Sequence, residues 1–297
     1  MSAGKFVCFL VTVFRLYFVA GEVSVKPFHL SFPSFEKFSV IRPQHAWKTL
    51  SYGRKHNLIS MSLYGQELRY VRGALENSEI VRQFWPGWIL RIYHDGLQSA
   101  EVLQLLRERG VELISVPSEN ISASSGHLWR FLALNKSREF ERIIFRDIDA
   151  RLSERDRSAV LEWCRSPFLF HALHDHPHHT FSIMAGMWGT VSGFIAQEIT
   201  DLVHNYVFDR TVNFDHLDDQ RWLHEVLYPH VKPFALNHES FYCKEGTFTY
   251  RLAFPTMRLN STDYVGNIYS PVNGFKGEVL ANSCPQECRR EHNWTTC

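Results

Sequence analysis

A regular alternation of strand-like and helix-like segments across residues 57–149 constrains the fold of this chain more than any other feature. Short apolar runs at residues 57–63, 88–93, 111–116 and 142–145 are typical of strands. The segments between them, residues 68–81, 99–109 and 127–136, carry apolar side chains at the spacing of a helix. Strands that alternate with helices form parallel sheets covered by their crossover helices. We therefore expect an α/β fold, a mainly parallel sheet of the Rossmann type flanked by helices.

The regularity weakens after residue 149. The pattern there indicates a charged helix at 154–165, a strand at 168–171, helices near 193–207 and 217–227, and then irregular chain. A chain of 297 residues suffices for one α/β domain with appendages. We expect a signal peptide or weak signal anchor at 1–21, an N-terminal arm at 22–55, a single α/β domain at 56–275 and a cysteine-rich tail at 276–297.

The first 21 residues have the pattern of a secretory signal. Lys5 precedes an apolar run that ends in the small residues Ala20 and Gly21. Arg15 cuts this run well short of the roughly 20 residues that span a membrane, which disfavours an uncleaved anchor. A buried N-terminal strand is the alternative. Glycosylation sequons begin at Asn120, Asn135, Asn260 and Asn293. We expect a protein of the ER or Golgi lumen, or a secreted one, with membrane contact only through this segment if it is uncleaved.

The cysteines agree with an oxidising compartment. After the signal segment the chain has five, at positions 164, 243, 284, 288 and 297. Five cysteines allow two disulfides with one thiol left over, and the sequence does not assign the pairing. A zinc site in the tail is the rival interpretation, but the spacing lacks the paired C-x2-C hooks of such sites.

The charge balance limits the ligand classes. There are 32 Lys and Arg residues against 31 Asp and Glu, a formal net charge of +1. This balance gives no bulk attraction for nucleic acid, so we expect no nucleic-acid partner. A polyanionic ligand must be held by local groups.

An Asp-x-Asp pair, Asp147 and Asp149, follows the fourth predicted strand. Side chains two apart on extended chain share a face, so both carboxylates can bind one divalent cation. Mg²⁺ and Mn²⁺ prefer oxygen ligands and leave positions open for substrate phosphates. The alternative is structural, because the two aspartates can cap the next helix or pair with Arg146, Arg151 or Arg155.

Further segments in the same order strengthen the ligand-binding interpretation. They are Ser62–Gly65, Phe84–Trp88, Trp129–Leu132, Phe145–Arg155, Asp175–Pro177, Gly186–Gly189, Asp219–Gln220 with Trp222–Leu223, Phe254–Arg258 and Val265–Gly266. Together they resemble a little-characterised group of GT-A-like glycosyltransferases found in bacteria, large viruses and some eukaryotes, over roughly residues 57–270. The chain departs from that group at His174, where the group has arginine, and at Ala185, where it has glycine.

The resemblance implies a donor site. Asp149 is expected to bind the metal directly, Asp147 to bind ribose or the metal, and His238 to supply a third metal ligand, with His230 as a competitor. Ser62, Tyr64 and Asp95 lie where GT-A folds seat the base and ribose. For Tyr64 an ordinary turn aromatic is an equal alternative.

The resemblance also implies an acceptor side. Asp218 or Asp219 is expected to act as the base on an acceptor hydroxyl, with Gln220 contacting substrate, although an acidic first helical turn explains these residues equally well. The other substrate-binding residues implied are Arg130, Asp175, His176, Gly186 and Trp188. Their structural alternatives are surface pairing for the arginine, zinc binding in the histidine-rich run 171–179, and a tight turn with Trp188 in the core.

The function expected from these residues is transfer of a sugar from a nucleotide-diphosphate sugar, by family habit a UDP-sugar, to a hydroxyl of a glycan, protein or lipid. The cofactor expected is Mn²⁺ or Mg²⁺. Two alternatives stay open: an inactive secreted sugar-binding protein of the same fold, and a phosphatase whose first Asp is the nucleophile. The phosphatase is disfavoured because Ala150, Arg151 and Leu152 follow the motif.

Overall fold

The computed structural model describes residues 13–19, 22–28, 56–116, 125–208, 218–244, 250–272, 274, 276–281 and 283–296. The chain divides into two compact units, residues 1–46 and 47–297. In the first unit β1 (Val13–Val19) pairs antiparallel with β2 (Glu22–Phe28). Most of the segment predicted as a signal lies outside the described residues, and the signal stays a prediction. Within the described parts of the chain, no helix is long and apolar enough to cross a bilayer.

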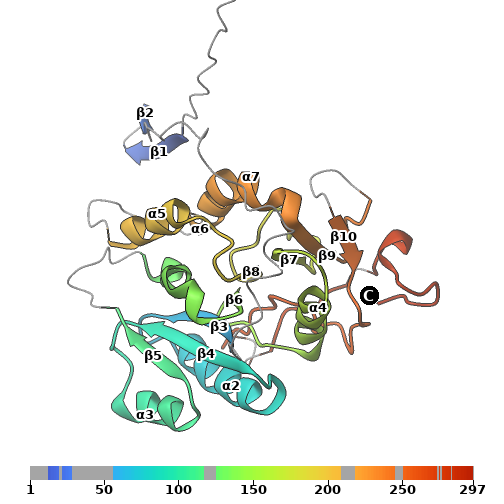
Figure 1. The fold of residues 1–297 in the computed structure, drawn as a ribbon, viewed down its shortest axis with the longest axis horizontal. Helices are drawn as coiled ribbons and strands as arrows, with labels where there is room; N and C mark the ends of the chain where they lie inside the picture. Colours follow the sequence, from blue (N-terminus) through green and yellow to red (C-terminus); the bar gives the residue numbers. More distant parts are fainter. Residues whose placement is uncertain are drawn as a thin grey trace, which may run out of the picture. The chain divides into compact units, whose positions relative to one another are not determined.

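The second unit is built on an eight-stranded sheet in the order β10-β9-β7-β8-β6-β3-β4-β5 (Figure 1). Its strands are β3 (Asn57–Leu63), β4 (Trp88–His94), β5 (Glu112–Ser115), β6 (Arg142–Arg146), β7 (Phe170–His174), β8 (Met187–Val191), β9 (Ala235–Glu239) and β10 (Tyr250–Ala253). All neighbouring pairs are parallel except those of β8, which runs antiparallel to β6 and β7. The predicted α/β fold, a mainly parallel sheet flanked by helices, is confirmed.

Helical segments connect these strands. They are α2 (Leu68–Phe84), α3 (Ala100–Glu108), the 3₁₀ segment η3 (Gly126–Glu139), α4 (Glu154–Cys164), α5 (Gln197–Phe208), α6 (Asp218–Trp222), the π-helical η4 (Leu223–Leu227), α7 (Tyr228–Val231), and the 3₁₀ segments η5 (Lys232–Phe234) and η6 (Gln286–Cys288). In Figure 1, α2 and α3 lie beside β4 and β5, and η3 lies on the other side of these strands, next to α5.

The largest apolar cluster lies between the sheet and η3, α5 and the α6–α7 region. Leu58 of β3, Phe131 of η3 and Trp188 of β8 are fully buried in it. Phe131 and Phe145 pack edge to face with ring centroids 5.4 Å apart, and Trp188 stacks on Phe145 at 4.1 Å. Burial of such large rings dominates core energetics. This core fixes η3, which carries Arg130, against the central strands.

The first half of the chain was predicted closely, and in the second half the helices were predicted but most of the strands were not. The segment from Gly186 to Gly189 has a turn pattern in sequence, but β8 begins within it at Met187. This strand forms because the segment pairs antiparallel with β6, where Met187 lies opposite Arg146. The strand predicted at 168–171 is shifted to 170–174. Parallel pairing with a distant β9 sets that register, which no local pattern encodes.

The C-terminal tail is stapled as its cysteines suggested. Cys243 forms a disulfide with Cys288, and Cys284 is disulfide-bonded as well, while Cys164 has a free thiol. Asn135, Asn260 and Asn293 of the sequons are exposed, and Asn120 lies outside the described residues. Their glycosylation stays a prediction.

Candidate active site at the carboxyl end of the sheet

The Asp-x-Asp motif lies at the carboxyl end of the two central parallel strands. β3 and β6 pair in parallel with Ser60 opposite Phe145, so the chain after Leu63 and the chain after Arg146 leave the sheet at the same edge. Ligands of open α/β sheets bind at this edge. The predicted donor residues that follow β3 and the motif after β6 are therefore brought to one place.

Helix α2 holds the backbone of the motif. Buried Asn77 donates from Nδ2 to the carbonyl oxygens of Ile148, at 3.2 Å, and Ala150, at 2.9 Å, and its Oδ1 accepts from the amide of Leu152 at 3.1 Å. A Cβ on Gly73 would lie 1.9 Å from the Ile148 oxygen, so only glycine allows this approach. The turn that carries the two aspartates is thus anchored by α2, and the Tyr269 amide also donates to the Asp149 carbonyl at 3.0 Å.

Asp147 lies between an arginine and a glycine. Its Oδ1 accepts from Arg130 Nη1 at 2.5 Å, and 37% of its side chain is exposed. A Cβ on Gly186 would lie 1.9 Å from its Oδ2. The sequence placed Gly186 beside the donor sugar, and the structure gives it a role in making room for the Asp147 carboxylate.

Arg130 joins three elements. Its backbone amide donates to Ser62 Oγ at 2.8 Å, and its carbonyl accepts from Ser60 Oγ at 2.7 Å, which fixes η3 to β3. Its guanidinium, 6% exposed, donates from Nη1 to Asp147 and from Nη2 to Asp219 Oδ2 at 2.9 Å. The residue links the motif with the predicted acceptor side and has no side-chain surface for substrate.

Asp149 lacks a cation that neutralises it. It is 8% exposed, and burial together with the charge of Asp147 raises its pKa from 3.8 to about 6. The nearest cation, Arg69 Nη1, lies 3.9 Å from its Oδ2, beyond hydrogen-bond distance. A buried carboxylate beside a second carboxylate is an electrostatic setting in which a divalent cation binds.

Aromatic rings line the side of the site next to β3. Tyr64 lies against Tyr70, with ring centroids 5.6 Å apart, and against Trp129 at 5.9 Å. A Cβ on Gly126 would lie 2.4 Å from the Tyr64 ring, so that glycine is required by the ring's position. Asp95 accepts from the Gly65 amide at 2.6 Å, and thereby ties the turn after β4 to the turn after β3. Tyr64 thus forms a wall of the site, and Asp95 positions it.

The acidic turn of α6 divides its roles. Asp219 is 5% exposed and accepts from Arg130 and from the Gln220 amide, at 2.7 Å, so both carboxylate oxygens are engaged. Gln220 Oε1 accepts from the Ala185 amide at 3.0 Å and holds the segment before β8. Asp218 pairs with Arg221 at 2.8 Å on the more exposed side of the helix. The turn therefore anchors the site through Asp219 and Gln220 and presents Asp218.

Asp175 is placed differently from its prediction as a substrate ligand. It is fully buried, and its carboxylate accepts from Arg155 Nε at 2.7 Å, Arg258 Nη2 at 2.6 Å, Ser240 Oγ and the Val265 amide. Burial opposes its ionisation, but the two guanidiniums outweigh burial and lower the pKa. We assign it a structural role because nothing of its carboxylate is left for a ligand.

Two other predicted substrate residues lie apart from the motif's open side. Trp188 is fully buried between aromatic rings of the core, which is the structural alternative stated above. His176 is partly exposed and lies against the rings of His178, His179 and Tyr264, beside the Asp175 cluster. Trp188 is too deeply buried to contact a sugar in this structure, whereas solvent reaches the side chain of His176.

The third predicted metal ligand is not brought to the motif. His238 lies on β9, three strands from β6, which corresponds to about 14 Å. Its ring shares hydrogen bonds with His171 at 2.8 Å and with Glu162 at 2.8 Å. The competitor of His238 for the role of third ligand, His230, lies on α7. Arg146, which the sequence offered as a partner of the motif aspartates, is buried and donates to Asp156 instead. No group of three metal-ligating side chains is present in the described part of the chain, which also leaves the histidine-rich run without a zinc site.

Sequence reasoning missed four residues at the site: Arg69, Tyr70, Gly73 and Asn77. A signal for the last two was available, since Gly73 and Asn77 lie four apart on the apolar face of α2, where a glycine and an amide have no use in simple packing. Arg69 and Tyr70 gave no signal, because their relation to Asp149 depends on where the first turn of α2 meets the motif.

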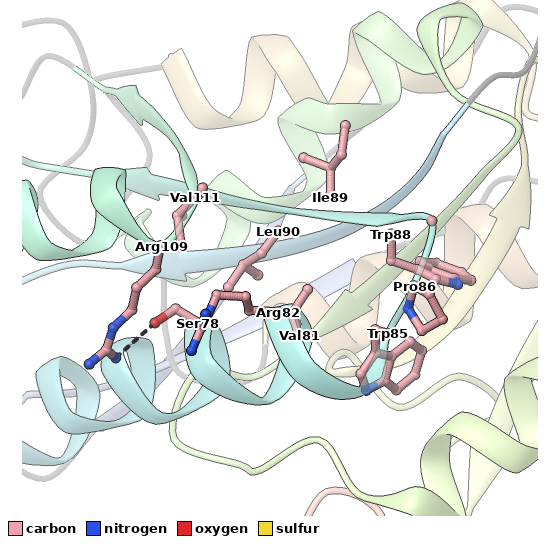
Figure 2. A pocket seen from close by; sticks show the side chains of 12 residues that line it. Ser78, Val81, Arg82, Trp85, Pro86, Trp88, Ile89, Leu90, Arg109 and Val111 are labelled. Atoms are coloured by element: carbon pink, nitrogen blue, oxygen red, sulfur yellow. Dashed lines mark hydrogen bonds between the residues drawn. The ribbon is translucent and has the colours of Figure 1, made fainter.

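A hollow of about 220 Å³ lies at the opposite edge of the sheet, at the start of β4 (Figure 2). Trp85, Pro86 and Trp88 form one end of it, and Arg109 reaches toward Ser78 at the other, with an Nη1–Oγ distance of 3.2 Å. None of the residues predicted for function lines it. The Asp-x-Asp motif and its neighbours lie at the opposite, carboxyl ends of the strands.

Comparison with known proteins finds similarity to solved structures and none to family models or curated proteins. The chain is similar to the mannosyltransferase PcManGT from Pyrobaculum calidifontis, solved in complex with GDP-Man and Mn²⁺, with a TM-score of 0.36 and 12% identity. The likeness covers 54% of this chain and 52%, about half, of that one.

Proposed function

We propose that this protein is a metal-dependent glycosyltransferase that moves a sugar from a nucleotide-diphosphate sugar, with a UDP-sugar as the first donor to test, to a hydroxyl of a glycan, protein or lipid. The observation that carries the proposal is the pair Asp147 and Asp149 at the ligand-binding edge of the sheet. The pair is held in place by α2, and burial together with the charge of Asp147 raises the pKa of Asp149. Two such carboxylates can bind a divalent cation, which in turn binds an anionic substrate.

The donor set fits Mg²⁺ or Mn²⁺. Two carboxylates are hard oxygen ligands, and such ions are commonly held by one or two carboxylates with phosphates and water in the other positions. The lack of a third protein ligand among the described residues is consistent with this arrangement. When bound, the cation would stabilise the charge that develops on the diphosphate leaving group.

The chain's own residues supply positioning. Arg130 orients Asp147 by a charge-assisted hydrogen bond, and the two serines of β3 hold the backbone of Arg130. Tyr64 offers an aromatic wall next to the motif. At the acceptor side we keep the proposed base role with Asp218, since Asp219 is buried with both oxygens engaged, whereas 22% of the Asp218 side chain is exposed.

A secretory location remains part of the proposal. The disulfide between Cys243 and Cys288 supports it, because such bonds persist in oxidising compartments.

Thermal-shift measurements of the full chain with a panel of nucleotide sugars, each with and without Mn²⁺, test the function. A cognate donor should raise the melting temperature only with Mn²⁺, and Asp149→Asn should abolish the shift. Asp201→Asn, at an exposed aspartate of α5, is the matched control and should keep the shift. Glycan binding without any nucleotide-sugar effect would replace the proposal with a sugar-binding protein.

A further inference from the structure

Arg69, the second residue of α2, lies beside the motif. Its Nη1 lies 3.9 Å from Asp149 Oδ2, its Nη2 donates to the Tyr70 hydroxyl at 2.5 Å, and its guanidinium carbon lies 4.4 Å from the centroid of the Tyr70 ring. Glu67 Oε2 lies 3.1 Å from its Nε. One third of the side chain is exposed. The guanidinium is therefore oriented by its neighbours while solvent reaches it.

The two arginines beside the motif differ in what they can still do. Arg130 is buried and bound to two carboxylates, so moving it would leave Asp147 and Asp219 without their partner. Arg69 Nη1 lies 3.9 Å from Asp149 Oδ2, which is too far for a hydrogen bond. A guanidinium that solvent reaches, and whose Nη1 lies beyond hydrogen-bond distance of Asp149, is available to a ligand.

We propose that Arg69, oriented by Tyr70, binds the diphosphate of the donor. This inference rests on the proposed function, because it places the diphosphate at the Asp147–Asp149 pair. A planar guanidinium binds phosphate oxygens through parallel N–H donors, and such charge-assisted bonds are about twice as strong as neutral ones. An arginine here also offsets the repulsion between the diphosphate and the two aspartates.

The test uses the full chain and inorganic pyrophosphate, which needs no knowledge of the base or sugar. Calorimetric titration of pyrophosphate in excess Mn²⁺ compares wild type with Arg69→Gln and Arg69→Lys. Arg69→Gln should weaken pyrophosphate binding about tenfold, and Arg69→Lys should recover part of the loss because the charge returns without the planar fork. Direct Mn²⁺ titration should show binding equal to wild type or tighter, because a competing cation near Asp149 is gone.

The matched control is Arg72→Gln, one turn further along α2, where the arginine is exposed and pairs with Glu76 at 2.5 Å. It should bind pyrophosphate like wild type, and melting temperatures of the three variants report whether each folds. Equal pyrophosphate affinity in wild type and Arg69→Gln overturns the role of Arg69 and leaves the proposed function standing. Failure of the wild-type chain to bind pyrophosphate with Mn²⁺ overturns both.

Discussion

Two clusters of buried acid illustrate opposite uses of the same chemistry. Asp175 is surrounded by donors, with two arginines, a serine and a backbone amide on one carboxylate, and its pKa is lowered. Asp149 is nearly as buried, has another aspartate as its near neighbour, and its pKa is raised to about 6. Both aspartates were candidate ligand-binding residues in the sequence.

The difference teaches how to separate a structural acid from a functional one. Around Asp175 the donors exceed what one carboxylate needs, so the protein itself stabilises the charge. At the motif only Asp147 has a hydrogen-bonded arginine among the described residues, and the arginine near Asp149 lies 3.9 Å away. Gly186, Gly73 and Asn77 hold the carboxylates in place. Strain or repulsion kept in place by surrounding structure is a mark of functional sites.

The largest effect is expected from Asp175→Asn. This change leaves Arg155 and Arg258 buried without their counter-charge, and breaking a buried pair from one side costs about 3–5 kcal/mol. A drop in melting temperature of roughly 6–20 °C should follow for a domain of this size. Asp147→Asn, in the Asp-x-Asp motif, should change the melting temperature by only a few degrees. Equal losses in the two variants would remove the distinction between the clusters.

Gly186→Ala should damage the motif without touching an acid. The new methyl carbon would meet Asp147 Oδ2 at 1.9 Å, so the carboxylate must turn away. We expect Mn²⁺ affinity to fall about 10- to 100-fold, the range found when residues supporting a metal ligand are changed. Ala185→Gly, at the neighbouring position, adds no atoms and should leave Mn²⁺ affinity near that of wild type in the same titration.

The sequence predicted this edge of the sheet better than it predicted the partners there. Local periodicity and the position of the motif sufficed for the strands up to residue 146 and for the nearness of Ser62, Tyr64 and Asp147. The partners of Asp175 and Asp219 were out of reach, because their arginines come from 20 and 89 residues away in the chain. The number of hydrogen-bond donors around a carboxylate depends on tertiary packing, and this number gave both Asp175 and Asp219 their structural roles.

Asp149→Asn should make the folded protein more stable at neutral pH. Because the pKa of Asp149 is about 6 in the folded state against an ordinary 3.8, the folded state holds the proton more tightly, and stability falls as pH rises from about 4 through about 6. The variant lacks this loss, so it should gain on the order of 2 kcal/mol at pH 7–8 and little below pH 4. Denaturant titrations across this range measure it. A variant less stable than wild type at pH 8 would contradict the account.

Glu162 provides an intermediate case and the smallest expected effect. This partly exposed carboxylate shares a hydrogen bond with His238 and an ion pair with Arg290, and these partners, His238 first, lower its pKa to about 2. A lowered pKa contributes stability above the ordinary value near 4.5, and that contribution is lost as pH falls toward 2. Because 29% of the side chain is exposed, Glu162→Gln should cost only about 1 kcal/mol at pH 7. The cost should vanish near pH 2, opposite in sign to the pH dependence of the Asp149 variant, and denaturant titration of the two variants side by side compares them directly. If Glu162→Gln lowered the free energy of unfolding as much as Asp175→Asn, solvent exposure would not determine how much each carboxylate contributes to stability.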